Sequence, residues 1–284
     1  MSAGASGEDG RAPLIITVAP NGARKTKADH PALPIAPEEL AETAARCQAA
    51  GAAMIHLHVR DAEGGHSLDP DTYRAAIEAI EARLGGEILI QATTEAAGRY
   101  QPTEQMAAMR ALKPAALSLA VRELLPDGED TAQGAAFLRE MHAGGTLIQY
   151  ILYDAEDVRR FERLRGEGVI PEARPAVLFV LGRYRVGSVS TPDDLLPFLA
   201  AAREGEGYRG RWMVCAFGPL EAACGLTAAG LGGHVRVGFE NNLLLADGTR
   251  APDNAALVRQ VAEAAHLMGR PLADAAAARR MLAA

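Results

Sequence analysis

The strongest constraint on the fold is an eight-fold repeat in which a short apolar run precedes a segment with helical periodicity. The apolar runs recur roughly every 30 residues, which is the length of one strand followed by a crossover helix. They are continuous and not alternating, as expected for parallel strands that are covered on both faces. The runs are LIITVA (14–19), AMIHLHV (53–59), EILIQAT (87–93), AALSLAV (115–121), LIQYILY (147–153), AVLFVL (176–181), WMVCAF (212–217) and HVRVGF (234–239).

The segments between these runs have the amphipathic pattern of helices. In residues 37–50, Pro37 suits the first helical position, glutamates follow where the helix dipole favours negative charge, and Gly51 ends the pattern. The same reasoning predicts helices at 70–84, 103–112, 131–143, 154–166, 192–204, 219–230 and 253–268. A last helix, at 273–283, is expected to pack under the strands.

Eight strand–helix units predict an α/β fold, a (β/α)8 TIM barrel that forms one domain over residues 13–284. Residues 1–12 are small, polar and acidic, and we expect them to form a loose tail. The alternative fold is a doubly wound open sheet. Its dinucleotide-binding form needs a glycine-rich first turn, but the turn after the first run holds one glycine, Gly22, so that fingerprint is absent there.

Composition and charge exclude several classes of partner. The chain has 284 residues, a net charge of −7 and no run of Lys or Arg, so no nucleic-acid partner is expected. No apolar run approaches the roughly 20 residues that span a bilayer, and no secretion signal is evident at the N-terminus. Cys47, Cys215 and Cys224 are an odd number without metal-ligand spacing, which favours structural cysteines in a reduced, cytoplasmic protein.

The stretch IHLHVRD, residues 55–61, places two histidines in an apolar strand. Because His56 and His58 are two residues apart, both side chains are expected on one face, near the C-terminal end of the strand. Active sites of (β/α)8 barrels lie at that end. A divalent metal would satisfy both imidazoles, and the alternative is a pair of core histidines bonded to neighbouring carbonyls.

Glu240 is a third candidate ligand, because it follows the eighth strand and strands eight and two both border strand one in a closed barrel. Two imidazoles and one carboxylate are a common zinc set that leaves one coordination position open. Arg236 lies four residues earlier on the same face, as a carboxylate clamp beside the metal or as an ion pair inside the barrel. Arg60 is expected to share the face of the histidines and to contact Glu240 or the substrate.

These residues lie in a chain that resembles the β-keto acid cleavage enzyme family, from about residue 14 to the C-terminus. The resemblance rests on the ordered stretches IITVAPNGA, PALPIAPEELAE, AGAAMIHLHVRDAEGGHSLD, LGGHVRVGFENNLLLADG and NAALVRQVAEAAHLMGRPLA. It implies a zinc enzyme that condenses a β-keto acid with acetyl-CoA and releases acetoacetate and a new acyl-CoA. It also implies a homo-oligomer, often a tetramer.

The resemblance places the zinc ligands of the family on His56, His58 and Glu240, and its strand-eight arginine on Arg236. Zinc would then polarise the keto acid and stabilise an enolate, while the arginine holds a carboxylate or orients a base.

The hydroxyl residues of the family also have matches. The hydroxyl at the end of the third strand falls on Thr93, or on Thr94 if the loop is shifted, and Ser118 matches a hydroxyl on the fourth strand. The resemblance implies that these groups bond developing oxyanions.

Three positions depart from the family pattern. Asn241 stands where the family typically has an aspartate as general base, and an amide cannot accept a proton near neutral pH. Arg24 stands where an amine-binding member has a glutamate, so we expect a neutral or second-carboxylate substrate in place of an amino-bearing one. Glu95 stands where the family usually has glycine; it would replace the base, pair with Arg24, or be an ordinary loop residue.

Two other functions stay open from the sequence. A metal-dependent hydrolase on the same barrel is one, although its histidine pair usually lies on the first strand with further histidines later. A non-catalytic paralogue that binds metal and an acyl metabolite is the other, and Asn241 favours it. Arg183 and Arg185, after the sixth strand, would meet coenzyme A phosphates or be solvated, whereas His66 and His234 are expected to be structural.

Overall fold

The computed structural model describes residues 12–128, 130–183, 189–204, 208 and 210–283. Eight parallel strands close into a barrel in the order β1-β10-β9-β8-β7-β6-β5-β2. The barrel strands are β1 (Ile16–Val18), β2 (Met54–His56), β5 (Leu89–Thr93), β6 (Ala116–Ala120), β7 (Leu147–Leu152), β8 (Ala176–Leu181), β9 (Arg211–Ala216) and β10 (His234–Val237). The predicted (β/α)8 barrel is confirmed. The open-sheet alternative is wrong, because β1 pairs with both β10 and β2 and leaves no edge there.

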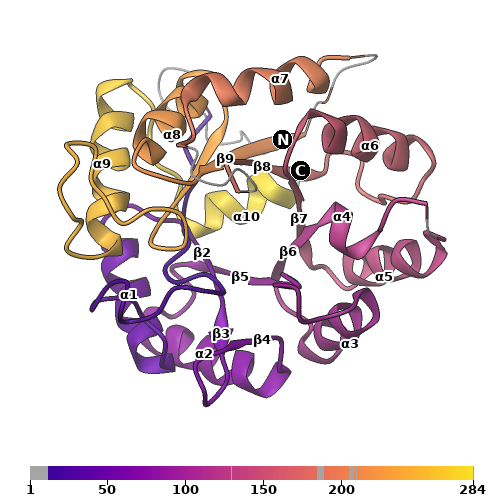
Figure 1. Cartoon of the computed structure of the whole chain (residues 1–284), viewed down its shortest axis with the longest axis horizontal. Coiled ribbons are helices and arrows are strands. Elements are labelled where there is room, and N and C mark those ends of the chain that lie inside the picture. The colour runs from indigo at the N-terminus through magenta and orange to yellow at the C-terminus, as the bar shows by residue number, and fades with distance from the viewer. Residues whose placement is uncertain (1–11, 129, 184–188, 205–207, 209, 284) are drawn as a thin grey trace, which may run out of the picture.

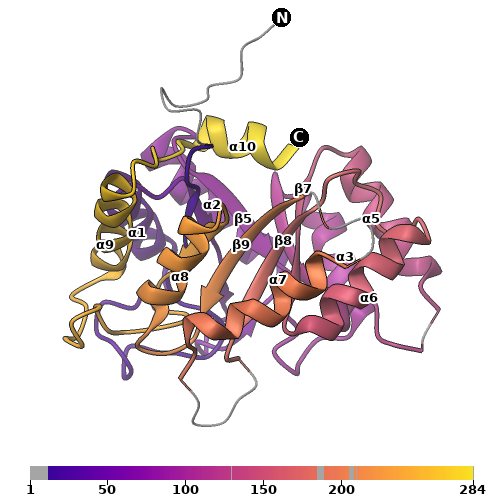
Figure 2. The ribbon, with the colours of Figure 1, turned by 90° about the horizontal axis from the view of Figure 1, so that it is seen from above.

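Helices surround the barrel on its outside (Figure 1). They are α1 (Pro37–Ala49), α2 (Pro70–Leu84), α3 (Pro102–Leu112), α4 (Val121–Leu124), α5 (Ala132–Ala143), α6 (Ala155–Gly166), η1 (Pro192–Leu195), α7 (Leu196–Ala202), α8 (Glu221–Gly230) and α9 (Asn254–Leu267). One further helix, α10 (Ala275–Ala283), lies across one end of the barrel (Figure 2). The predicted helices are all present. The sequence pattern missed the short helix α4, and the helix predicted at 192–204 begins as the 3-10 turn η1.

Helix α2 shows how local sequence sets these boundaries. The carboxylate of Asp69 accepts a hydrogen bond from the backbone N–H of Thr72 at 2.8 Å and so caps the first turn. Pro70 follows at a position where no amide donor is needed. Gly85 ends the helix in the left-handed conformation, at φ 54°, which costs glycine least.

Two hydrophobic layers hold the barrel together. The larger lies between strands and helices, and the smaller fills the barrel interior with residues such as Met54, Leu89 and Leu178. Helix α10 closes one end, which we call the base, and Figure 2 shows it lying across that end. Ala278 of α10 belongs to the interior layer, so the prediction that the last helix packs under the strands is confirmed.

The second strand is shorter than predicted. The run at 53–59 was expected to be one strand, but β2 ends at His56 and a small antiparallel hairpin follows. Its strands are β3 (Val59–Arg60) and β4 (His66–Ser67), with Arg60 opposite His66. The alternation argument for the two histidines is therefore wrong in detail, because His58 lies in the connection between β2 and the hairpin.

The predicted loose tail, residues 1–12, lies outside the described residues except for residue 12. No helix within the described ranges combines the length and the apolarity that a membrane span requires. Cys47, Cys215 and Cys224 are free and buried.

Candidate active site

Three predicted ligands converge at the C-terminal end of the strands, which we call the mouth. The Nε2 atoms of His56 and His58 are 3.0 Å apart. Glu240 Oε2 lies 3.6 Å from His56 Nε2 and 3.5 Å from His58 Nε2. The barrel produces this meeting because β2 and β10 are both neighbours of β1.

The geometry of this cluster fits a divalent metal. Two ligand atoms at about 2.0–2.1 Å from a tetrahedral Zn²⁺ are about 3.3–3.4 Å from each other, and the three separations here bracket that value. All three side chains are buried, and Glu240 Oε2 has no hydrogen-bond partner among the described residues. A buried carboxylate oxygen without a partner is costly, and a bound cation would satisfy it. The residues therefore fit a metal site with nitrogen and oxygen donors.

The loop after β1 holds Glu240 in place. Gly22 packs directly against it: a Cβ at Gly22 would lie 2.6 Å from Glu240 Cγ, and the φ of 62° also favours glycine. The ammonium of Lys25 donates a hydrogen bond to the backbone carbonyl of Glu240 at 2.7 Å. The turn at 21–25, which contains Arg24, thus positions a candidate metal ligand.

A second buried glutamate, Glu221, forms hydrogen bonds with residues on both sides of Glu240. Glu221 accepts hydrogen bonds from the backbone N–H of Gly238 at 3.0 Å and from the amide of Asn242 at 3.3 Å. Burial raises the pKa of Glu221 to about 8, although both hydrogen bonds act in the opposite direction. Glu221 is a positioning residue that the sequence analysis did not find.

A chain of amides fixes the tautomer of His56. Gln91 Oε1 lies 3.0 Å from His56 Nδ1, and the Gln91 amide donates to Gln149 Oε1 at 3.2 Å. The Gln149 amide in turn faces the sulfur of Met213 at 3.8 Å. Since Nδ1 must carry the proton to donate to Gln91, Nε2 keeps the lone pair that a metal needs. The signal in the sequence was a polar residue inside each of two apolar strands, EILIQAT and LIQYILY.

Arg236 of β10 lies next to the cluster, four residues before Glu240. Its side chain is 3% exposed, and Nη2 is 3.5 Å from Glu240 Oε1 and 3.3 Å from the sulfur of Cys215. Burial and the Arg236 charge lower the pKa of His56 well below 6.5. Burial alone would raise the pKa of Glu240, but Arg236 and the two histidines outweigh it and hold that pKa well below its usual value. The cluster is thus two imidazoles, a carboxylate and a fixed cation.

Glu95 lies beside the cluster, but its partner is not Arg24. Glu95 Oε2 is 3.6 Å from His58 Nε2, and Glu95 Oε1 pairs with the guanidinium of Arg183. Arg24 is exposed, and no hydrogen bond or ion pair joins it to another described residue. Arg185, the other arginine predicted after the sixth strand, lies outside the described residues.

The predicted hydroxyl residues divide into two groups. Thr93 is buried at the end of β5 and lines the small cavity beside the cluster. Ser118 Oγ lies below it, 3.4 Å from His56 Nδ1. Thr94 is buried with its hydroxyl unpartnered among the described residues, and it does not line that cavity. The buried amide of Asn241 likewise has neither of its atoms in a hydrogen bond within the described part of the chain.

Arg60 supports a loop and does not bond Glu240. Its guanidinium donates to the backbone carbonyls of Gly22, Lys25 and Gly64 at 2.6–3.1 Å. It thereby ties the β3–β4 hairpin to the loop after β1. Within the described part of the chain, Arg60 makes no hydrogen bond or ion pair with Glu240, since it lies on the hairpin and not on β2.

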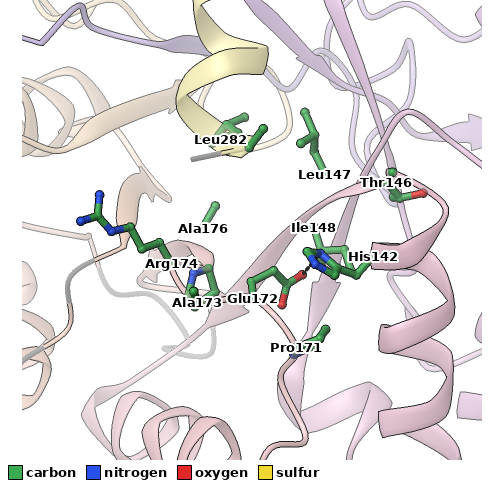
Figure 3. Close-up of a pocket in the computed structure, with 13 residues that line it drawn as sticks. His142, Thr146, Leu147, Ile148, Pro171, Glu172, Ala173, Arg174, Ala176 and Leu282 are labelled. Atoms are coloured by element: carbon green, nitrogen blue, oxygen red, sulfur yellow. Dashed lines mark ion pairs between the residues drawn. The ribbon is translucent and has the colours of Figure 1, made fainter. Parts of the chain in front are cut away.

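The cavity beside the cluster is smaller than a cavity elsewhere in the barrel. The space beside the cluster, the site cavity, has about 10 Å³, with His56, Thr93, Glu95, Arg183, Arg236 and Glu240 in its wall. A larger cavity of about 440 Å³ lies at the base, where His142 Nδ1 is 3.9 Å from Glu172 Oε1 (Figure 3). None of the predicted site residues lines the base cavity.

Comparisons with known proteins identify the family of the chain. A family model described as beta-keto acid cleavage enzyme matches residues 13–283. The chain is 32% identical to a 3-keto-5-aminohexanoate cleavage enzyme of Fusobacterium nucleatum over 274 residues, which covers 95% of this chain and 97% of that one. It is 31% identical to a 3-oxoadipate:acetyl-CoA acetyltransferase of Cupriavidus necator over 279 residues, 95% of this chain and 94% of the relative.

Solved structures support the fold. A complex of ObcA with oxaloacetate superposes with a TM-score of 0.71 at 17% identity, over 89% of this chain and 67% of that one. The family match extends over nearly the whole described barrel and includes every residue of the His-His-Glu cluster. The chain is therefore an enzyme that belongs to the β-keto acid cleavage enzyme family.

Proposed function

We propose that this enzyme is a zinc-dependent acyltransferase that condenses a β-keto acid with acetyl-CoA and releases acetoacetate and a new acyl-CoA. The acetyl carbon would form a bond with C2 of the keto acid while its bond to the sulfur of coenzyme A breaks, which releases the coenzyme A thiolate. The original bond between C2 and C3 would then break, and the sulfur of coenzyme A would take the acyl group. The proton that leaves C2 at the start returns to C2 at the end, so the reaction balances.

One observation carries this proposal: three donor atoms of His56, His58 and Glu240 converge at the mouth, and Glu240 Oε2 has no hydrogen-bond partner within the described residues. When bound there, zinc would act as a Lewis acid toward the keto and carboxylate oxygens of the substrate. With neutral imidazoles and one carboxylate as ligands, the site would keep a net positive charge, which suits an anionic acid.

Arg236 would hold the substrate carboxylate or a developing oxyanion. Its Nε and Nη1 atoms are buried and unpartnered among the described residues, whereas Nη2 faces Glu240. A guanidinium with two free donors in a fixed plane is suited to a carboxylate. Thr93 in the cavity wall would add a donor to the same oxygens.

Glu95 would act as the general base that Asn241 cannot be. Its carboxylate lies in the cavity wall, 3.6 Å from His58, so it is within reach of a substrate held at the cluster. Ser118 lies against His56 and would help to orient that ring.

The substrate is proposed to be a β-keto acid without an amino group. Relatives carry names that include 3-keto-5-aminohexanoate and 3-oxoadipate, so the family admits different side chains. Arg24, on the loop that packs against Glu240, disfavours a cationic group there, and Thr94 and Arg60 would support the loops around it.

The test is metal content together with acetoacetate release. Purified wild-type protein is expected to hold about one zinc per chain and to release acetoacetate only when acetyl-CoA and a β-keto acid are both present. The variant His56→Ala/His58→Ala should lose both, and His142→Ala, at the base, should keep both. Zinc without turnover on any β-keto acid would favour a non-catalytic paralogue, and absence of zinc would remove the metal mechanism. The cytoplasmic location and the homo-oligomer stay predictions.

A further inference from the structure

Arg183 lies at the boundary between the site cavity and a second space at the mouth. It follows β8, and its guanidinium lies 5.4 Å from the centre of the Phe217 ring. The side chain is 16% exposed, and it pairs with Glu95, which is 9% exposed. Glu95 is in turn 3.6 Å from His58 Nε2. One carboxylate therefore separates a nearly buried guanidinium from the metal cluster.

The site cavity is too small for a substrate. Its 10 Å³ or so has room for about one water molecule. A second space, the side cavity, has about 260 Å³ and adjoins it: Tyr153, Val180 and Arg183 line both. Of these three residues, Arg183 has the long, flexible side chain. A rotation of Arg183 away from Glu95 would join the two cavities and open the cluster to a ligand of several carbon atoms.

Charge determines which ligand can cause this rotation. A neutral ligand would leave the guanidinium and the Glu95 carboxylate separated in a mostly buried region, which is costly. A ligand with its own carboxylate at the far end would replace Glu95 as the partner of Arg183, so no charge is left unpaired on that arginine. The other arginine of the side cavity, Arg122, is held by Asp154 and Asp157 and is less available.

We propose that Arg183 exchanges Glu95 for the distal carboxylate of the substrate, so that the preferred substrate is a 3-oxo acid with a second carboxylate. The exchange rests on the proposed function, because it also frees Glu95 to take the C2 proton while the first carboxylate lies at the metal cluster. Arg183 then selects the substrate, and the selected substrate releases the base.

Binding of two acids with equal chain length tests this proposal without turnover. The metal-loaded enzyme, without acetyl-CoA, is titrated calorimetrically with 3-oxohexanedioate and with 3-oxohexanoate. We expect the wild type to bind the diacid about 10- to 100-fold more tightly, since a hydrogen-bonded charge pair contributes on that scale. Arg183→Met should bring the ratio close to one, and Arg183→Lys should give an intermediate ratio. Arg174→Met, at the exposed edge of the base cavity, should leave the ratio as in the wild type.

Glu95→Gln separates an exchange from a fixed ion pair. Without a competing carboxylate, Arg183 should bind the diacid several-fold more tightly than in the wild type, although turnover falls. A ratio near one in the wild type, an unchanged ratio in Arg183→Met, or weaker diacid binding in Glu95→Gln would each overturn the proposal. Loss of the ratio in Arg24→Met with Arg183 intact would overturn it too, in favour of Arg24. An Arg183-dependent ratio without acetoacetate release from any keto acid would support the exchange and contradict the proposed reaction.

Discussion

Buried polar side chains lie at both ends of strand β10, but they are hydrogen-bonded at one end and partly unpartnered at the other. At the base, His234 Nδ1 accepts the backbone N–H of Ile15 at 3.1 Å, and Arg270 donates to three backbone carbonyls. At the mouth, Arg236 and Glu240 keep three polar atoms without a hydrogen-bond partner in the described chain. At the base, His234 and Arg270 form hydrogen bonds with the backbone and so stabilise the fold. At the mouth, the unpartnered atoms of Arg236 and Glu240 can bind a ligand.

This difference is the reason why we place the candidate site at the mouth and not at the larger base cavity. The base cavity has far more space and one buried atom without a hydrogen-bond partner in its wall, Glu172 Oε1, but no pair of imidazoles and no buried guanidinium faces it among the described residues. The mouth has little space and several unpartnered buried groups. Because each such group costs free energy when no ligand is bound, unpartnered atoms mark function better than volume does.

We expect the largest effect from a substitution at the mouth. Arg236→Met removes the buried guanidinium but keeps most of its apolar volume. We expect kcat/KM for acetoacetate release to fall about 10³-fold, as is usual when a fixed donor to a developing charge is lost. Steady-state kinetics of the zinc-loaded protein measures this. Activity within 10-fold of wild type would show that Arg236 neither binds the substrate nor stabilises the transition state.

Arg270→Met is the matched change at the base and should affect stability alone. It leaves the carbonyls of Ala12, Ala229 and Gly233 without their donor, which we expect to cost about 2–4 kcal/mol. The Tm should fall by about 3–7 °C, while zinc content and kcat/KM below the transition stay as in the wild type. Arg174→Met, on an exposed side chain, is the control. A loss of zinc in folded Arg270→Met would mean that the two ends are coupled.

A smaller effect is expected when a candidate metal ligand is kept and only its hydrogen-bond partner is replaced. Gln91→Leu removes the acceptor of His56 Nδ1–H, so the ring can rotate or change tautomer. Zinc affinity, measured by competition with a chelator, should fall about 10- to 100-fold. Gln91→Glu restores an acceptor and should recover most of the affinity. Equal zinc affinity in wild type and Gln91→Leu would refute the role of the amide chain.

Much of the fold followed from the sequence because it depends on periodicity. Eight apolar runs gave eight strands, and barrel closure brought the ends of β2 and β10 together on either side of β1. The meeting of His56 and His58 with Glu240 followed from that topology alone. The alternation argument for the histidine pair was nevertheless wrong in detail, since β2 ends at His56 and His58 lies in the connection that leads to the β3–β4 hairpin.

The side-chain pairings could not be predicted in the same way. Glu95 and Arg183 are 88 residues apart, and their contact depends on rotamers at the mouth and not on strand order. Gln91 and Gln149 meet inside the barrel because of register across β5, β6 and β7, which no periodicity specifies. For Arg24, a position close to the site did not predict a contact with it. The turn at 21–25 packs against Glu240, but the Arg24 side chain is exposed.

The smallest expected effect concerns Glu221, which joins the mouth end of β10 to helix α8. Burial raises its pKa from 4.5 in the unfolded chain to about 8, so the folded protein keeps a proton that the unfolded chain releases. A raised pKa means stability that is present below pH 4.5 and is lost as the pH rises through 8. From pH 6 to pH 7, the free energy of unfolding of the wild type should therefore fall by about 1 kcal/mol relative to Glu221→Gln, in which the amide cannot ionise. Urea unfolding of both proteins at each pH measures the difference, and the subtraction removes the contribution of the buried histidines. A difference that stays constant or rises with pH would show that the two hydrogen bonds from Gly238 and Asn242 keep Glu221 ionised in the folded protein.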